Sequence, residues 1–170
     1  MNRRERHTTE GVLSGLSAAE QGALQACARD YGIELARDAT VYVTEITGET
    51  RRSVFRRATE QFRVRIALVL ADPVLLLAIT GESGISVLHA RMRDLQASSA
   101  ADSLPGVEPG SRLARKLEEL GGDGVDLAGF RVSGEDTAAT GSYFLQVGPP
   151  DGERAKAAIT SAVARGSSGE

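Results

Sequence analysis

The chain has 170 residues, 41% of them apolar, and a formal net charge of −3, which suits one domain with a hydrophobic core. Only 4% of the residues are aromatic and none is tryptophan, which argues against a nucleic-acid module that stacks bases on aromatic side chains. Because Cys27 is the single cysteine and no apolar secretory segment follows Met1, we expect a protein of a reducing, cytoplasmic compartment.

The amino-terminal part is predicted to be a tail followed by a helix. Residues 1–11 are polar and charged, so we expect them to be disordered. Ser17 followed by Glu20 is a capping-box pattern, and apolar residues with helical spacing come after it. We therefore predict a helix over 18–31 as the first element of a single α+β domain that occupies residues 12–165.

A strand and a central hairpin are predicted next. The β-branched segment 41–47 predicts a strand, and the Arg-rich segment 49–61 is expected to connect it to the hairpin. Asp72-Pro73 fits a turn between two apolar runs, which together are too short and too interrupted to cross a bilayer. The first run has apolar residues with a period of two, as one face of a strand requires: Phe62, Val64, Ile66, Leu68 and Leu70.

The remaining chain alternates between predicted strands and helices, which brings the number of expected strands to six. The predicted elements are a strand at 85–92, a loop at 97–110, an inserted helix at 111–120, strands at 125–132 and 142–147, an amphipathic helix at 151–165 and a disordered tail at 166–170. The expected fold is thus an antiparallel meander capped by a carboxy-terminal helix.

This order of elements resembles the pleckstrin-homology-like superfold, including its bacterial members and the related GRAM domains. The segments that carry the resemblance are the hairpin at 65–80, the strand and loop at 85–95, and the strand at 143–150 that leads into the last helix. Together they place a PH-like core, a curled barrel or sandwich, at residues 41–165. The family commonly has an aromatic residue in its final helix, which is absent here, and the amino-terminal and inserted helices are additions to its pattern.

A cluster of arginines is the candidate ligand-binding site. Across residues 51–65, six arginines stand against one acid, Glu60. Guanidinium groups bind phosphate oxygens through two parallel hydrogen bonds, and the resemblance implies a basic, headgroup-binding loop at this point of the chain. The alternative is that the arginines keep a sheet edge solvated. The six residues are Arg51, Arg52, Arg56, Arg57, Arg63 and Arg65.

No other residues combine into a catalytic or metal-binding constellation, so we expect no cofactor and no metal. Cys27 lies on the apolar face of the predicted helix and is expected to pack in the core. His89 alternates into a strand and is expected to be structural, since one cysteine and two histidines cannot supply a zinc site. The acidic groups are expected to be solvated surface rather than cation ligands: Glu118-Glu119, Asp123, Asp126 and Glu135-Asp136.

The favoured interpretation is a non-enzymatic binding or scaffolding module that uses a free sheet edge or the Arg-rich segment. A protein partner is favoured because strand addition needs only an open edge, and an anionic lipid or other polyanion is the second possibility. Two alternatives stay open at this point. One is a small enzyme or cavity protein that binds a small molecule, and the other is a homo-oligomeric structural protein.

Overall fold

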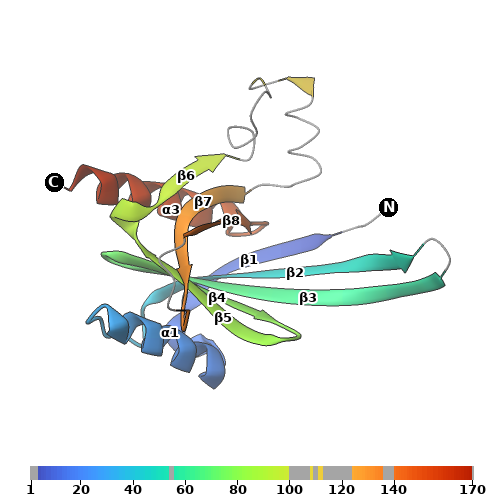
Figure 1. Ribbon diagram of the computed structural model, residues 1–170, viewed down its shortest axis with the longest axis horizontal. Coiled ribbons are helices and arrows are strands. Elements are labelled where there is room, and N and C mark those ends of the chain that lie inside the picture. Colours follow the sequence, from blue (N-terminus) through green and yellow to red (C-terminus); the bar gives the residue numbers. More distant parts are fainter. Residues whose placement is uncertain are drawn as a thin grey trace.

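The protein, described by a computed structural model, is an antiparallel β-sheet with a helix against each of its faces (Figure 1). The structure describes residues 4–53, 56–99, 108, 111–112, 124–135 and 140–169, without the side chains of 50–60 and 99. The elements are β1 (Glu5–Val12), the 3-10 turn η1 (Leu13–Gly15), α1 (Ala18–Asp30), β2 (Thr40–Ser53), β3 (Arg56–Ala71), β4 (Val74–Gly81), β5 (Gly84–Arg91), the 3-10 turn η2 (Met92–Asp94), β6 (Gln96–Ser99), β7 (Gly124–Val132), β8 (Gly141–Gln146) and α3 (Gly152–Ser168).

The strands from β1 to β5 form a meander, in which each strand pairs with the next one in sequence. The full order is β1-β2-β3-β4-β5-β7-β6, with β8 also on β7, and every ladder is antiparallel. Only two residue pairs join β5 to β7, Leu88 with Val132 and His89 with Arg131, so β6–β8 diverge from the main sheet there. The predicted antiparallel meander with a carboxy-terminal helix is confirmed, with eight described strands instead of six because β1 and β6 were not expected.

Strands β3 and β4 form the hairpin that the apolar run predicts, with Asp72 and Pro73 at its turn. Alternate residues of β4 enter two different cores. Leu75 and Leu77 belong to the core that also contains α3, whereas Leu76 belongs to the core that contains α1. A strand that is covered on both faces has no solvent side, which explains the uninterrupted leucine run.

Helix α1 begins with the capping box that the sequence predicts. The backbone N–H of Glu20 donates to the Ser17 hydroxyl at 3.2 Å, and the Glu20 carboxylate accepts from the Ser17 backbone N–H at 3.0 Å. The apolar stripe of the helix packs onto the sheet, where Leu24, Cys27 and Ala28 are at most 1% exposed. The predicted helix is confirmed, and its apolar face excludes solvent from one side of the sheet.

Strand β1 overturns the prediction of a disordered tail at residues 1–11 over the part from Glu5 onward. Its backbone pairs with β2 over eight residues, and its other edge meets the segment after β8. There the Thr8 N–H donates to Pro149 O at 3.1 Å, and the Thr8 carbonyl accepts from the Asp151 N–H at 3.0 Å. The buried Thr8 hydroxyl accepts from the Gly148 N–H at 2.9 Å. Main-chain pairing on both edges orders a segment that has little apolar surface to bury.

The carboxy-terminal helix is longer than predicted, since α3 continues to Ser168 and the expected tail at 166–170 is helical over its first residues. A side chain at Gly166 would lie 2.8 Å from the backbone carbonyl carbon of Met92, so the helix packs closely on η2. The predicted amphipathic helix is confirmed. Ala155, Ile159, Ala162 and Val163 on its inner face are buried, and Ala158, expected on the same face, is half-buried.

The inserted helix predicted at 111–120 falls outside the described residues, apart from Ser111 and Arg112. The predicted loop at 97–110 also lies mostly outside them, although its first residues are paired in β6. None of the helices in the described part of the chain is long and apolar enough to cross a membrane.

Candidate functional site

The hairpin of β2 and β3 extends beyond the rest of the sheet (Figure 1). The ladder between β1 and β2 ends at Thr47, and the ladder between β3 and β4 begins at Arg65. Among the described strands, residues 48–53 and 56–62 therefore pair only with each other. We call these two segments the arm. Along one edge of each segment, no described strand forms hydrogen bonds with the backbone N–H and C=O groups.

Four of the six predicted anion ligands lie in the arm, Arg51 and Arg52 in β2 and Arg56 and Arg57 in β3. The expectation that residues 49–61 form a connecting loop is wrong, because β2 and β3 run through almost all of it. A two-stranded ladder in water needs no apolar face, so the absence of apolar alternation does not prevent strand pairing there. The four side chains lie outside the described part, and their role in binding an anion stays a prediction.

The other two predicted ligands, Arg63 and Arg65, lie nearer the body of the sheet and contact carboxylates. The Arg63 Nη2 donates to both oxygens of Glu45 at 3.0 Å. Arg65 has its Nε 3.2 Å from a Glu20 oxygen and its Nη1 3.7 Å from Glu45. Because these carboxylates already neutralise both guanidinium groups, an anionic ligand would have to displace them. The structure thus separates this pair from the four arginines of the arm.

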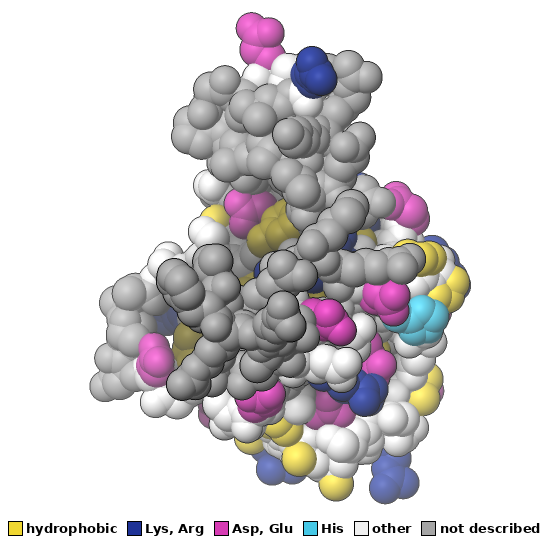
Figure 2. All heavy atoms as spheres, turned by 90° about the vertical axis from the view of Figure 1, so that its right-hand side faces the viewer, with side chains coloured by type: hydrophobic (Ala, Val, Ile, Leu, Met, Phe, Trp, Pro, Cys, Tyr) yellow, Lys and Arg dark blue, Asp and Glu magenta, His cyan; other side chains and the backbone are white. Residues whose placement is uncertain are grey.

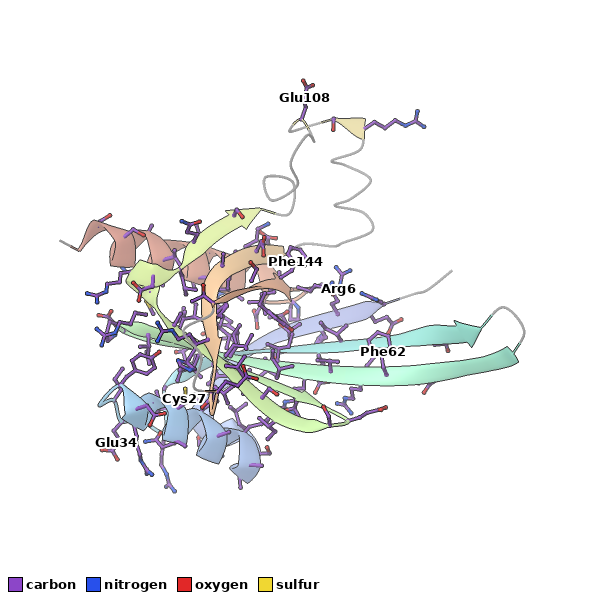
Figure 3. All side chains as sticks on the ribbon, viewed as in Figure 1. Arg6, Cys27, Glu34, Phe62, Glu108 and Phe144 are labelled. Atoms are coloured by element: carbon purple, nitrogen blue, oxygen red, sulfur yellow. The ribbon has the colours of Figure 1, made fainter. Side chains whose placement is uncertain are left out.

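An aromatic contact closes the base of the arm, where Gly48 of β2 pairs with Phe62 of β3. The Phe62 ring lies over Gly48, since a Cβ there would be 2.7 Å from the ring (Figure 3). The guanidinium carbon of Arg4 lies 5.7 Å from the centre of the same ring, within cation–π range. Phe62 also packs against the core that contains α3, so the base of the arm is joined to that core and to Arg4, the residue before β1.

Acidic side chains surround the same base. A cleft of about 660 Å³ is lined by Glu5, Glu49 and Glu82 together with Arg63 and Phe62. Figure 2 looks at the end of the molecule from which the arm projects and shows acidic side chains spread over this face. The four arginines that the sequence has between residues 51 and 57 therefore come farther along the arm than these acidic side chains.

Cys27 is a core residue, as the sequence predicts. It lies on α1 against the sheet (Figure 3) and is 1% exposed. Burial raises the pKa of its thiol, an effect that the interaction with Ser133 partly opposes. A buried thiol with a raised pKa supplies little thiolate, so it is a poor nucleophile.

Tyr31 and His89 form a pair at the carboxyl end of α1 that the sequence analysis missed. The Tyr31 hydroxyl and His89 Nδ1 are 2.5 Å apart, and the two rings meet edge to face with centres 5.5 Å apart. Burial and the nearby Arg131 lower the pKa of His89, against a smaller opposing effect of Asp30. Burial also raises the pKa of Tyr31. The pair is therefore neutral at neutral pH.

This lowered pKa predicts an acid-sensitive fold. Unfolded His89 binds a proton near pH 6.5, whereas the folded protein holds it neutral to lower pH, so its contribution to stability is present above pH 6.5. That contribution is lost as the pH falls through the folded-state pKa. Melting temperatures between pH 7.5 and 5 should fall more steeply for the wild type than for His89→Asn, whose side-chain amide can donate to or accept from the Tyr31 hydroxyl but does not titrate. Equal slopes would contradict this prediction.

The described residues contain no group of three or more potential metal ligands. Of the acidic residues weighed as cation ligands, Asp126 is half-buried and Glu135 is exposed. The others lie outside the described residues, and they are Glu118, Glu119, Asp123 and Asp136.

Comparisons with known proteins identify no relative, since no family model, no curated protein and no solved structure matches the chain. The case for a function therefore rests on the arm and on the side chains described above.

Proposed function

We propose that the protein is a non-enzymatic binding module that holds an extended, acidic segment of a partner protein along the arm. The observation that carries the proposal is the projection of residues 48–53 and 56–62 beyond the sheet, with no described strand on either outer edge. Such edges accept a further strand through main-chain hydrogen bonds. A two-stranded ribbon is marginally stable in water, so an added strand would also stabilise the arm.

The charge of the arm favours an acidic partner. Between residues 48 and 62 the sequence has four arginines against Glu49 and Glu60. Guanidinium groups form paired hydrogen bonds with carboxylates, which adds specificity to main-chain pairing. The glutamates around the base of the arm would repel the same partner, so we expect the contact on the outer part, from Arg51 onward.

We also propose that the fold is pleckstrin-homology-like, which the curled antiparallel meander and α3 support. In that family a basic segment at this position can take a lipid headgroup, which makes an anionic membrane the competing partner. We favour a protein because the basic segment is a pair of extended strands whose outer edges no described strand covers. A headgroup site needs arginines that converge from a loop.

The test compares two variants with the same loss of charge. In the arm variant, Arg51, Arg52, Arg56 and Arg57 are replaced by Gln. In the control, four exposed arginines elsewhere are replaced by Gln, namely Arg29, Arg37, Arg112 and Arg165. The probe is a short labelled peptide in which glutamate and valine alternate. A peptide in which lysine and valine alternate is the control of opposite charge. The arm variant should bind the acidic peptide at least about tenfold more weakly than the control variant.

Amide hydrogen exchange identifies the mode of binding, because an added strand protects outward-facing amides of residues 48–62 in the wild type. Equal peptide affinity of the two variants would overturn the proposal. Binding of the wild type to phosphatidylserine vesicles without binding to the peptide would also overturn it, in favour of a membrane. Concentration-dependent dimerisation lost only in the arm variant would overturn it in favour of self-association.

A further inference from the structure

A cleft of about 540 Å³ lies where β7 diverges from β5, at the carboxyl end of α1. Its lining includes Tyr31, Arg91, Arg131 and Gly129, and we call it the Tyr31 cleft. It lies outside the arm and shares no residue with it. The residues that line it come from α1, β5, η2 and β7, so the cleft depends on the tertiary fold rather than on one loop.

The charge of the Tyr31 cleft is positive among the described residues. Arg91, Arg93 and Arg131 line it together with Asp30 and Asp94. Arg93 and Asp94 form an exposed ion pair at 3.7 Å. Among the described residues, no carboxylate forms an ion pair with Arg91 or Arg131. With Asp94 paired to Arg93, the lining then has these two guanidinium groups against one carboxylate, that of Asp30.

The strand register places these two arginines on either side of a hollow. His89 pairs directly with Arg131, and Arg91 lies two residues beyond His89 on the same face of β5. Arg91 and Arg131 are therefore diagonal positions at the end of the β5–β7 ladder, where the two strands begin to separate, and both line the cleft. Gly129 also lines the cleft, and a Cβ there would lie 2.4 Å from the Asp94 carbonyl oxygen, so β7 and η2 pack closely at this wall of the cleft.

One of the arginines is held in place before any ligand arrives. The guanidinium carbon of Arg91 lies 5.9 Å from the centre of the Tyr31 ring, within cation–π range. The Tyr31 ring is in turn fixed by its hydrogen bond and edge-to-face contact with His89. A guanidinium that is ordered in the free protein loses less conformational entropy on binding.

We infer that the Tyr31 cleft binds the phosphate group of a small phosphorylated molecule, with Arg91 and Arg131 as its two ligands. Two guanidinium groups supply paired donors to the oxygens of a tetrahedral dianion. The cleft is larger than a phosphate ion, which leaves room for the organic part of a phosphomonoester. Tyr31 is a positioning residue that holds the Arg91 side chain.

The test is a titration with inorganic phosphate and with glycerol 3-phosphate at constant ionic strength, followed by thermal shift and calorimetry. Arg91→Gln and Arg131→Gln should each raise the dissociation constant at least about tenfold relative to Arg37→Gln, an exposed control outside the cleft. Tyr31→Phe keeps the ring under Arg91 and should change affinity less. Tighter binding of glycerol 3-phosphate than of phosphate identifies a phosphomonoester site, and the reverse order identifies a free-phosphate site.

The inference fails if the wild type shows no saturable binding of either probe at millimolar concentrations. It also fails if acetate binds as tightly as both probes, or if Arg91→Gln and Arg131→Gln bind as tightly as Arg37→Gln. Unchanged melting temperatures of the two cleft variants without ligand show that a loss of binding does not come from unfolding.

Discussion

Glu20→Ala should lower the free energy of unfolding by about 3–5 kcal/mol, the range for removing one partner of a buried ion pair. Glu20 is 2% exposed. Its carboxylate accepts from the Ser17 N–H and hydroxyl at 3.0 Å and from the Thr80 hydroxyl at 3.2 Å, and it lies 3.2 Å from Arg65 Nε. Alanine would leave these donors and the Arg65 guanidinium without this partner. Because the Arg65 side chain is 33% exposed and water can reach it, we expect the lower end of the range.

Two further variants separate the effect of the Glu20 charge from the effect of its helix-capping hydrogen bonds. Urea denaturation measures the free energy of unfolding of all three variants. Glu45→Ala removes the other carboxylate from the same Arg65, but this carboxylate is 32% exposed, so the loss should be under about 1 kcal/mol. Glu20→Gln keeps an acceptor oxygen and loses the charge, so its stability should be intermediate. Equal losses for Glu20→Ala and Glu45→Ala would contradict a structural role for the buried carboxylate.

The Glu20 contacts show how far local sequence information reaches. Ser17 and Glu20 are three residues apart, so their reciprocal hydrogen bonds could be predicted from spacing alone. The contacts with Arg65 and Thr80 could not, because they depend on how α1 packs across β3 and β4. Clustering in sequence therefore places Arg65 with the predicted ligands, although the fold pairs it with carboxylates.

The same limit explains which strands were predicted. Part of β3 was predicted because its residues from Phe62 to Leu70 place one apolar face in a core. The strand β1 has no such face, and its outer edge is fixed by contacts between Thr8 and Gly148, 140 residues away in sequence. The outer parts of β2 and β3 pair in water, where period-two apolar patterning is not required.

The two candidate sites were predictable to different degrees. The arginines of the arm form a cluster in sequence, so charge alone located them, although it could not distinguish a loop from paired strands. The Tyr31 cleft joins distant segments. A period of two places His89 and Arg91 on one face of β5, but Arg131 comes from β7, which follows β6 in the chain and reaches β5 through two residue pairs only.

Gly129→Ala should be the second strongly destabilising change, because two separate effects add at this position. Gly129 has φ +113°, a conformation that L-residues rarely adopt, and an imposed strain of this kind costs about 1–3 kcal/mol. The new Cβ would also lie 2.4 Å from the Asp94 carbonyl oxygen. This oxygen belongs to the backbone of η2 and cannot swing aside as a flexible side chain would, so overpacking should add about 1–3 kcal/mol.

Gly84→Ala is a control that isolates the first effect. Gly84 has the same φ of +113°, at the turn between β4 and β5, and nothing lies within 4 Å of the position that its Cβ would take. Its variant should therefore lose only the backbone contribution, and urea denaturation of both variants gives the steric contribution of Gly129 by difference. If the two variants were equally stable, the backbone of η2 would have to move away from the new Cβ without lowering the free energy of unfolding. The close contact between β7 and η2 beside the Tyr31 cleft would then not be a packing constraint of the fold.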